Sequence, residues 1–441
     1  MIQKLVLIIL IFNSTLLFGE TLEKVLIDTF NYYPDIKKSR FELNVAKKNL
    51  TISKTDFLPS IDLSMSQGRK VSKSNPDTSS YNFTNTNPST LDVDISQPLG
   101  ATKYLNLKSS RNDLDIAKLK NEALIQDTLY RATKAYYSYL KEKFLLDVAI
   151  KNENNLTQKF EATEKRFNFK DVTKTDVFQA KARLAEATAK RIEAENNVEI
   201  AESEFTAVVG RKPDINWFPD NKEKITGSNP KDWQKFATLP KLPLTLDQAL
   251  EIALENNHQL KQLFYELENS KISIKQSGLN FLPELSVTAT YGKSLDASRT
   301  VERRNDYEVT ADMSIPLFNK GHNFINLNKS KDTALSSHQA FESKKLNLTH
   351  EVKSAWKRIK SSKSSIESLE ISVESNLVAL EGVSKEAGVG SRTTLNILDA
   401  EKELTQAEAS LVNAQFSLID SSYQLLKSCG LLNFRYLGIN F

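Results

Sequence analysis

Residues 57–67 read FLPSIDLSMSQ and residues 281–291 read FLPELSVTATY, so one Phe-Leu-Pro phrase opens two similar stretches 224 positions apart. In both stretches apolar residues alternate with polar residues. A period of two predicts a β-strand with one apolar face and one polar face. The repetition predicts that the chain contains two copies of one structural unit.

Each predicted strand has a return partner with the same alternation, LDVDIS over residues 91–96 and YEVTADMSI over residues 307–315. These pairs form two β-hairpins whose strands have about nine or ten residues, the length that a tilted transmembrane strand needs. Four strands cannot close a barrel, and lipid does not tolerate open strand edges. We therefore expect the chain to complete a barrel with other copies of itself.

The polar faces of the four predicted strands carry carboxylates and no Lys or Arg. The carboxylates belong to Asp62, Asp92, Asp94, Glu284, Glu308 and Asp312. If the apolar faces contact lipid, these six side chains line a pore and favour cations. The alternative is that they are solvated polar residues with no effect on ion passage.

Helical sequence flanks both hairpins, which makes the predicted fold mixed α and β. Residues 21–56 are helical in pattern with an interruption at Pro34, and residues 245–280 repeat this stretch. After Pro98 and again after Pro316 the pattern stays helical for about seventy residues, to Asn168 and Gly388, which predicts helices roughly 100 Å long.

Shorter return helices follow over residues 173–210 and 393–430. Their apolar residues recur at three-and-four spacing, which predicts coiled-coil packing with close approach at the alanines. The seam residues are Val177, Ala180, Leu184, Ala187, Ala194, Val198, Ala201 and Phe205 in the first copy, and Leu404, Ala407, Leu411, Ala414, Leu418 and Leu425 in the second.

The remaining segments complete the predicted organisation. Residues 1–19, with Lys4 before an apolar run, indicate a cleaved signal peptide, the alternative being an uncleaved anchor. Residues 20–210 form the first repeat, residues 211–244 a Pro-rich connector, residues 245–430 the second repeat, and residues 431–441 a tail expected to pack beside the connector. Residues 69–90 and 293–305 are expected to be exposed loops. Trp217 and Trp233 in the connector are packing anchors or, alternatively, ligand-stacking residues.

The composition excludes several classes of function. A mean hydropathy of −0.40 with 26% charged residues is not that of a helical membrane protein. The 59 basic and 55 acidic residues give a net charge of +4, which indicates no nucleic-acid partner. The single Cys429, expected to be a packed small side chain, excludes an intrachain disulfide, and four scattered His predict no zinc site. No catalytic motif is present, so we expect neither an enzyme nor a cofactor.

The order of strands, very long helices, tight turns and return helices resembles the TolC family of outer-membrane channels. The most specific match is GVGSRTTLNILDA over residues 388–400, with residues 167–180 as its first-repeat counterpart. The resemblance implies a homotrimer whose twelve-stranded transmembrane β-barrel, with four strands from each protomer, continues as an α-helical coiled-coil tunnel into the periplasm. It also implies location in the outer membrane of a Gram-negative bacterium.

The resemblance further implies an exit duct for a tripartite efflux or type I secretion system. Such a duct contacts outer-membrane lipid and passively conducts substrate that an inner-membrane transporter delivers through a periplasmic adaptor. The alternative is a secreted coiled-coil structural or adhesive protein without a pore, which the long heptad helices alone would permit. The two lipid-length hairpins argue against that alternative.

The resemblance also assigns roles to the turns between the long helices and the return helices. The expected adaptor contacts are Val389, Gly390, Ser391, Val172 and Thr173. Asp399 and Asn396, three residues apart and so on one helix face, are expected at the periplasmic constriction, with Arg392 and Asp176 as links between neighbouring coils. The alternative is that Asp399 faces solvent on an ordinary helix surface.

The chain departs from the family pattern at three of these positions. It has Ala387 where well-studied members have an aromatic gate residue, Asn396 where an acid is expected, and Lys170 where Gly is frequent. These departures concern gating and partner fit, and they leave the predicted fold intact.

Overall fold

The computed structural model describes residues 21–74, 82–214, 239–298 and 301–439. The predicted signal peptide, Trp217 and Trp233 lie outside these residues. The chain divides into two compact units. The helical unit consists of Met1–Ile36, Leu124–Asn257 and Leu348–Phe441, and the sheet unit consists of Lys37–Ala123 and His258–Asn347.

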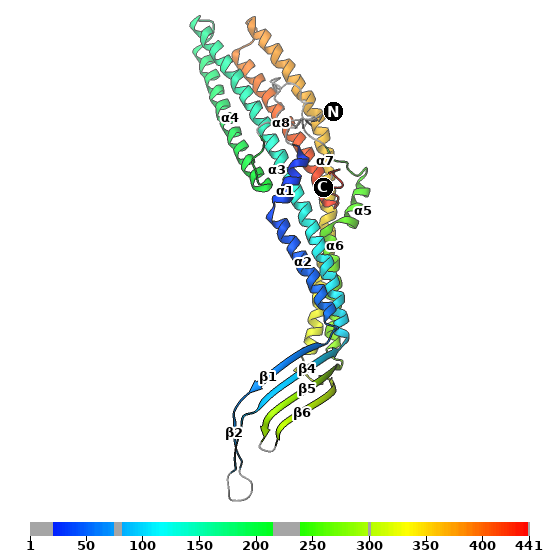
Figure 1. The fold of residues 1–441 in the computed structure, drawn as a ribbon. Coiled ribbons are helices and arrows are strands. Elements are labelled where there is room, and N and C mark those ends of the chain that lie inside the picture. Colours follow the sequence, from blue (N-terminus) through cyan, green and yellow to red (C-terminus); the bar gives the residue numbers. More distant parts are fainter. Residues whose placement is uncertain (1–20, 75–81, 215–238, 299–300, 440–441) are drawn as a thin grey trace, which may run out of the picture. The chain divides into compact units, whose positions relative to one another are not determined.

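The sheet unit contains a four-stranded antiparallel sheet. Its strands are β1 (Ser60–Gln67), β4 (Ser89–Leu99), β5 (Glu284–Ser298) and β6 (Val301–Ser314), side by side in that order (Figure 1). Asp62, Asp94, Thr290 and Glu308 lie opposite one another in one row across the sheet. Leu63, Val93, Tyr291 and Tyr307 form the next row. Since successive residues of a strand point to opposite faces, the predicted apolar and polar faces are confirmed.

The segments between the strands are largely β-structure, so the prediction of exposed loops over residues 69–90 and 293–305 is wrong for most of their length. Strands β2 (Lys70–Ser74) and β3 (Asn82–Thr86) pair within residues 69–90, and β5 and β6 continue through most of residues 293–305. Ladder hydrogen bonds join backbone groups, so Ser- and Asn-rich sequence does not prevent pairing. The longer β6 also places Arg304 on the polar face, where its Nε lies 2.7 Å from Asp306 Oδ1. The prediction of a face without Lys or Arg is therefore wrong at this end of the sheet.

The helices follow the predicted pattern closely. The short pairs are α1 (Leu22–Tyr32) with α2 (Pro34–Thr55), and α5 (Leu246–Asn256) with α6 (His258–Leu279). The long helices α3 (Ala101–Asn168) and α7 (His322–Gly388) have 68 and 67 residues, and the return helices are α4 (Lys174–Val209) and α8 (Thr394–Ser428). Among the described residues, no helix is both long and apolar enough for a membrane crossing.

The two repeats make equivalent contacts in the sheet unit. The Ser53 and Ser110 hydroxyls lie 2.6 Å apart between α2 and α3, and the Ser277 and Ser330 hydroxyls lie 2.7 Å apart between α6 and α7. Pairs of small hydroxyl side chains allow the helix axes to approach while each polar group is satisfied. In each repeat, the same hydroxyl contact therefore joins the helix before the hairpin to the helix after it.

The predicted seams of α4 and α8 pack in the core of the helical unit. Every seam residue is buried or half-buried, and Phe205 and Leu425 have no exposed surface. Cys429 is buried with its Sγ 3.5 Å from the Ala249 carbonyl oxygen, which confirms its expected role as a small packed side chain. The Tyr436 hydroxyl donates to the Lys241 carbonyl oxygen at 3.0 Å, so the tail contacts the connector as expected.

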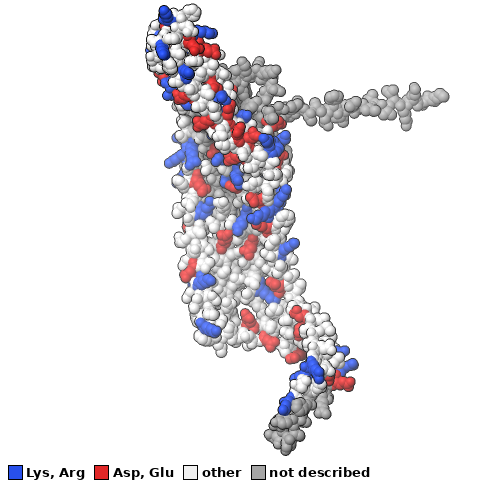
Figure 2. Space-filling view, turned by 90° about the vertical axis from the view of Figure 1, so that its left-hand side faces the viewer, with Lys and Arg blue, Asp and Glu red and all other residues white. Residues whose placement is uncertain are grey.

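Both return helices end where only glycine fits. Gly210 has φ of 87° and lies against the Tyr32 ring, while Gly430 has φ of 72°, and a Cβ there would lie 2.4 Å from the Asn256 carbonyl oxygen. The left-handed backbone and the close contact both exclude larger residues. Over the face shown in Figure 2, Lys and Arg are interspersed with Asp and Glu, in keeping with the small net charge.

Candidate functional site at the helical tips and the sheet

Two tight turns join the long helices to the return helices, and we call them the first tip (residues 166–176) and the second tip (residues 386–396). Lys170 and Gly390 occupy equivalent places with φ of 62° and 79°. The Asp171 amide donates to the Arg166 carbonyl at 2.9 Å, and the Ser391 amide donates to the Glu386 carbonyl at 2.9 Å. This bond pattern with a left-handed residue ends a helix by satisfying its last carbonyls. Both tips are therefore well-defined turns.

Each return helix begins with a capping box that uses a residue predicted for the constriction. In the first tip, Asp176 Oδ2 accepts from the Thr173 amide at 2.8 Å, and Thr173 Oγ1 accepts from the Asp176 amide at 3.2 Å. In the second tip, Asn396 Oδ1 accepts from the Thr393 amide at 3.1 Å. Because a capping side chain satisfies otherwise unpaired helix amides, Asp176 and Asn396 each have a structural role within their own protomer.

An ion pair of opposite polarity closes each tip. Arg166 Nε lies 2.6 Å from Asp171 Oδ2, whereas Arg392 Nε lies 2.8 Å from Glu386 Oε2. The predicted link from Arg392 to Asp176 of a neighbouring coil would have to replace both this second pair and the Asp176 cap. Each pair is about half-exposed, so each contributes about 0–1 kcal/mol.

Apolar side chains project from both tips. Phe169 is 85% exposed and Val389 is 82% exposed, at equivalent positions of the two turns. Phe178 is also exposed, with the Lys174 ammonium 5.7 Å from its ring centroid. Of these three residues, the sequence prediction included Val389 alone. An aromatic residue within a short polar turn is the signal that could have identified Phe169.

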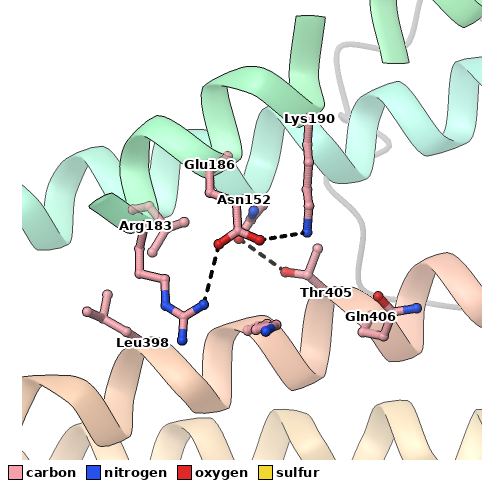
Figure 3. Close-up of a pocket in the computed structure, with 10 residues that line it drawn as sticks. Asn152, Arg183, Glu186, Lys190, Leu398, Thr405 and Gln406 are labelled. Carbon is pink, nitrogen blue, oxygen red and sulfur yellow. Dashed lines mark hydrogen bonds and ion pairs between the residues drawn. The ribbon is translucent and has the colours of Figure 1, made fainter. Parts of the chain in front are cut away.

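Asp399 of α8 lies beside a charged groove between α3, α4 and α8. Arg183 Nη2 is 2.9 Å from Asp399 Oδ1, and Arg183 Nη1 is 3.4 Å from Glu186 Oε2. Figure 3 shows Glu186 between Arg183 and Lys190, whose Nζ lies 3.3 Å from Glu186 Oε1. The hydrogen bond and charge of Lys190, with the contribution of Arg183, hold the pKa of Glu186 below its usual value.

The six predicted pore-lining carboxylates lie on one face of the sheet. Asp62, Asp94 and Glu308 share one row, in which the Thr290 hydroxyl donates to Asp94 Oδ1 at 2.6 Å. Asp92 is opposite Gly292, Asp312 is opposite Ser286, and Glu284 is opposite Ser314. The other face carries exposed Ile61, Leu63, Met65, Tyr307 and Val309. Among the described residues, no cluster of three or more His, Cys, Asp or Glu is placed to hold a metal ion.

Comparison with known proteins defines the class of protein to which this fold belongs. The family model described as outer membrane efflux protein matches residues 31–211 and 249–431. The chain therefore belongs to the outer membrane efflux protein family, and the predicted family, fold and outer-membrane location are confirmed.

Individual relatives agree with this assignment. The chain is 24% identical to the outer membrane efflux protein BepC of Brucella suis over 413 residues, which cover 91% of this chain and 84% of that protein. It is also 24% identical to the alkaline protease secretion protein AprF of Pseudomonas aeruginosa over 281 residues, 63% of this chain and 56% of that protein. The solved structure of the Campylobacter jejuni CmeC outer membrane channel superposes with a TM-score of 0.79 at 16% identity, covering 93% of this chain and 86% of that chain.

Proposed function

We propose that the chain is one protomer of a homotrimeric exit duct that passively conducts substrate across the outer membrane. An inner-membrane transporter delivers the substrate through a periplasmic adaptor, and the duct catalyses no reaction of its own. Family membership and relatives named for efflux and for protease secretion support this role.

The proposed trimer is supported chiefly by the two open edges of the four-stranded sheet. Within the described part of the chain, strands β1 and β6 each have one neighbour in the sheet, while the apolar face of the same strands is exposed. In lipid, each unpaired backbone group of an edge costs several kcal/mol. Joining β1 of one copy to β6 of the next removes both edges, and three copies give the twelve strands that the family resemblance implies.

The tips are proposed as the adaptor contact. Val172, Thr173, Val389, Gly390 and Ser391 lie in turns at the ends of helices of 67 or 68 residues. The exposed Phe169 and Val389 supply apolar side chains that a partner could bury. The duct is further proposed to narrow near Asn396 and Asp399, with Arg392 and Asp176 bordering the constriction. The sheet carboxylates are proposed to favour cations within the barrel.

Edge-to-edge assembly can be tested by disulfide crosslinking in a Cys429→Ala background. Leu63→Cys on β1 is combined in turn with Tyr307→Cys, Val309→Cys or Ala311→Cys on β6, which samples the register between copies. We expect oxidation to give covalent trimers for at least one combination. Val93→Cys on the central strand β4 is the matched control and should give none, because its neighbours belong to the same copy.

Two outcomes would contradict the proposal. One is a covalent ladder that ends at dimers or continues beyond trimers. The other is a chain that leaves the membrane fraction without detergent and forms no conducting channels in planar bilayers, as the coiled-coil structural alternative requires.

A further inference from the structure

We propose that Arg183 controls ion selectivity at the periplasmic end of the duct by neutralising Asp399 within the same protomer. The inference rests on the proposed function, which places Asp399 at the constriction. With Arg183 beside each Asp399, the constriction contains a ring of ion pairs instead of a ring of unpaired carboxylates, so its net charge is less negative.

The contact joins two helices that are far apart in sequence. Arg183 lies on α4 and Asp399 on α8, with 2.9 Å between Nη2 and Oδ1. The Arg183 side chain is 27% exposed, whereas the Asp399 side chain is 49% exposed. The Arg183 side chain is thus the more enclosed partner, beside the apolar cluster that includes Leu156, Ala187 and Leu398. A charge-assisted hydrogen bond in such a partly enclosed place holds its geometry better than a fully exposed pair.

The other charges of the groove do not compensate Asp399. Lys190 pairs with Glu186, and this pair is internal to α4. Lys402 lines the groove on α8, with no ion pair to Asp399 among the described residues. Arg183 contacts both Glu186 and Asp399, so it is the cation that joins the two carboxylates.

The pair is not duplicated by the internal repeat. With the offset of 220 that relates the two tips, the counterparts of Arg183 and Asp399 are Glu403 and Gln179. These residues cannot form the same ion pair. A trimer would therefore contain three such pairs, one for each Asp399, and no second set.

This arrangement predicts a gain of function when the cation is removed. In Arg183→Gln, each Asp399 loses its counter-charge, and a divalent cation on the channel axis meets three uncompensated carboxylates. At a separation of about 6 Å in a water-like dielectric, the attraction of a divalent cation to one carboxylate alone corresponds to about tenfold tighter binding, and the ring contains three. Cation selectivity should rise in parallel, since the net charge of the ring becomes more negative.

The test is single-channel recording in planar bilayers with Mg²⁺ added from the periplasmic side. In Arg183→Gln, half-block should require at least about tenfold less Mg²⁺ than in the wild type. Arg183→Lys keeps the charge and should block as the wild type does, while Arg183→Gln combined with Asp399→Asn should lose the gain. Lys190→Gln is the matched control, because it removes an equal charge from the same helix without touching Asp399.

The outcomes separate this inference from the proposed function. Channels that conduct normally, but whose Mg²⁺ block is the same in Arg183→Gln and the wild type, would overturn the role of Arg183 alone. Equal gains in Arg183→Gln and Lys190→Gln would also overturn it, because the effect would then be unspecific.

If Arg183→Gln does not assemble, Asp399→Asn provides the reciprocal test. It should weaken Mg²⁺ block and shift selectivity towards anions, and an unchanged selectivity would refute the pairing. A wild-type protein that forms no channels contradicts the proposed function itself.

Discussion

Replacing Lys170 by glycine should stabilise the first tip, because Lys170 holds a left-handed backbone with φ of 62°. That conformation costs a non-glycine residue about 1–2 kcal/mol, whereas glycine loses about 0.5–1 kcal/mol more conformational entropy on folding. The net gain is about 0.5–1 kcal/mol, which lowers the opening equilibrium of the turn about two- to fivefold. The second tip has Gly390 at the equivalent place, so Gly390→Ala should have the opposite effect there.

Hydrogen exchange of the detergent-purified protein measures this effect locally. The informative amides are those of Asp171 and Ser391, which donate the hydrogen bonds that close the two turns. In Lys170→Gly, the Asp171 amide should exchange about two- to fivefold more slowly, while Ser391 stays unchanged. In Gly390→Ala, the Ser391 amide should exchange faster and Asp171 should not change.

Lys170→Ala separates backbone strain from charge. It removes the ammonium but keeps a Cβ, so it should leave the exchange of Asp171 close to that of the wild type. If Lys170→Ala slows exchange as much as Lys170→Gly does, the charge of Lys170 is responsible and the reasoning from backbone strain is refuted. Faster exchange in Lys170→Gly would refute it as well.

Three further predictions concern the core, the sheet and pH. Phe205→Ala should cost about 3–5 kcal/mol of stability because the ring is fully buried, whereas Phe169→Ala should cost less than about 0.5 kcal/mol, and denaturant unfolding distinguishes them. Val309→Lys on the exposed apolar face should cost about 2–4 kcal/mol near the bilayer midplane, and Thr288→Lys on the polar face should not. Trimer yield after membrane insertion is the readout, and equal tolerance would mean that the lipid-facing side is the other one. Burial raises the pKa of Cys429 from its usual 9.0 to about 12, so the neutral thiol favours the folded state below pH 9 and this contribution is lost between pH 9 and 12. The melting temperature of the wild type should therefore fall relative to that of Cys429→Ala as the pH rises from 8 to 10.5, and a constant difference would contradict the assignment.

Much of the fold was predictable because the periodicity of apolar residues along the sequence matches the faces that the strands and helices bury or expose. The alternation after Phe57 and Phe281 identified strands β1 and β5, and the ends of both long helices were predicted at Asn168 and Gly388, where the structure has them. The seam on α4 was visible because its alanines and Phe205 recur with the helical period and all face the core.

The features that sequence could not supply depend on contacts between distant residues. The break between α5 and α6 has no proline, unlike the break at Pro34, and is accompanied by a hydrogen bond from Asn257 Nδ2 to the Ser428 carbonyl at 3.0 Å. The pairing of Arg183 with Asp399 joins residues 216 positions apart. The polar strands β2 and β3 were assigned to a loop because their side chains lack the apolar alternation that marks a half-buried strand.

The opposite polarity of the two tip ion pairs bears on how such a protein can change over evolutionary time. Arg166 pairs with Asp171, five residues later, and Glu386 pairs with Arg392, six residues later. Each charge is therefore balanced within a single turn. A paired exchange of both charges can thus invert the electrostatic pattern of one tip without unbalancing the helices or the other tip. Duplicated copies that started alike could in this way acquire different recognition surfaces, each altered by two nearby codons, while the scaffold between them stayed the same.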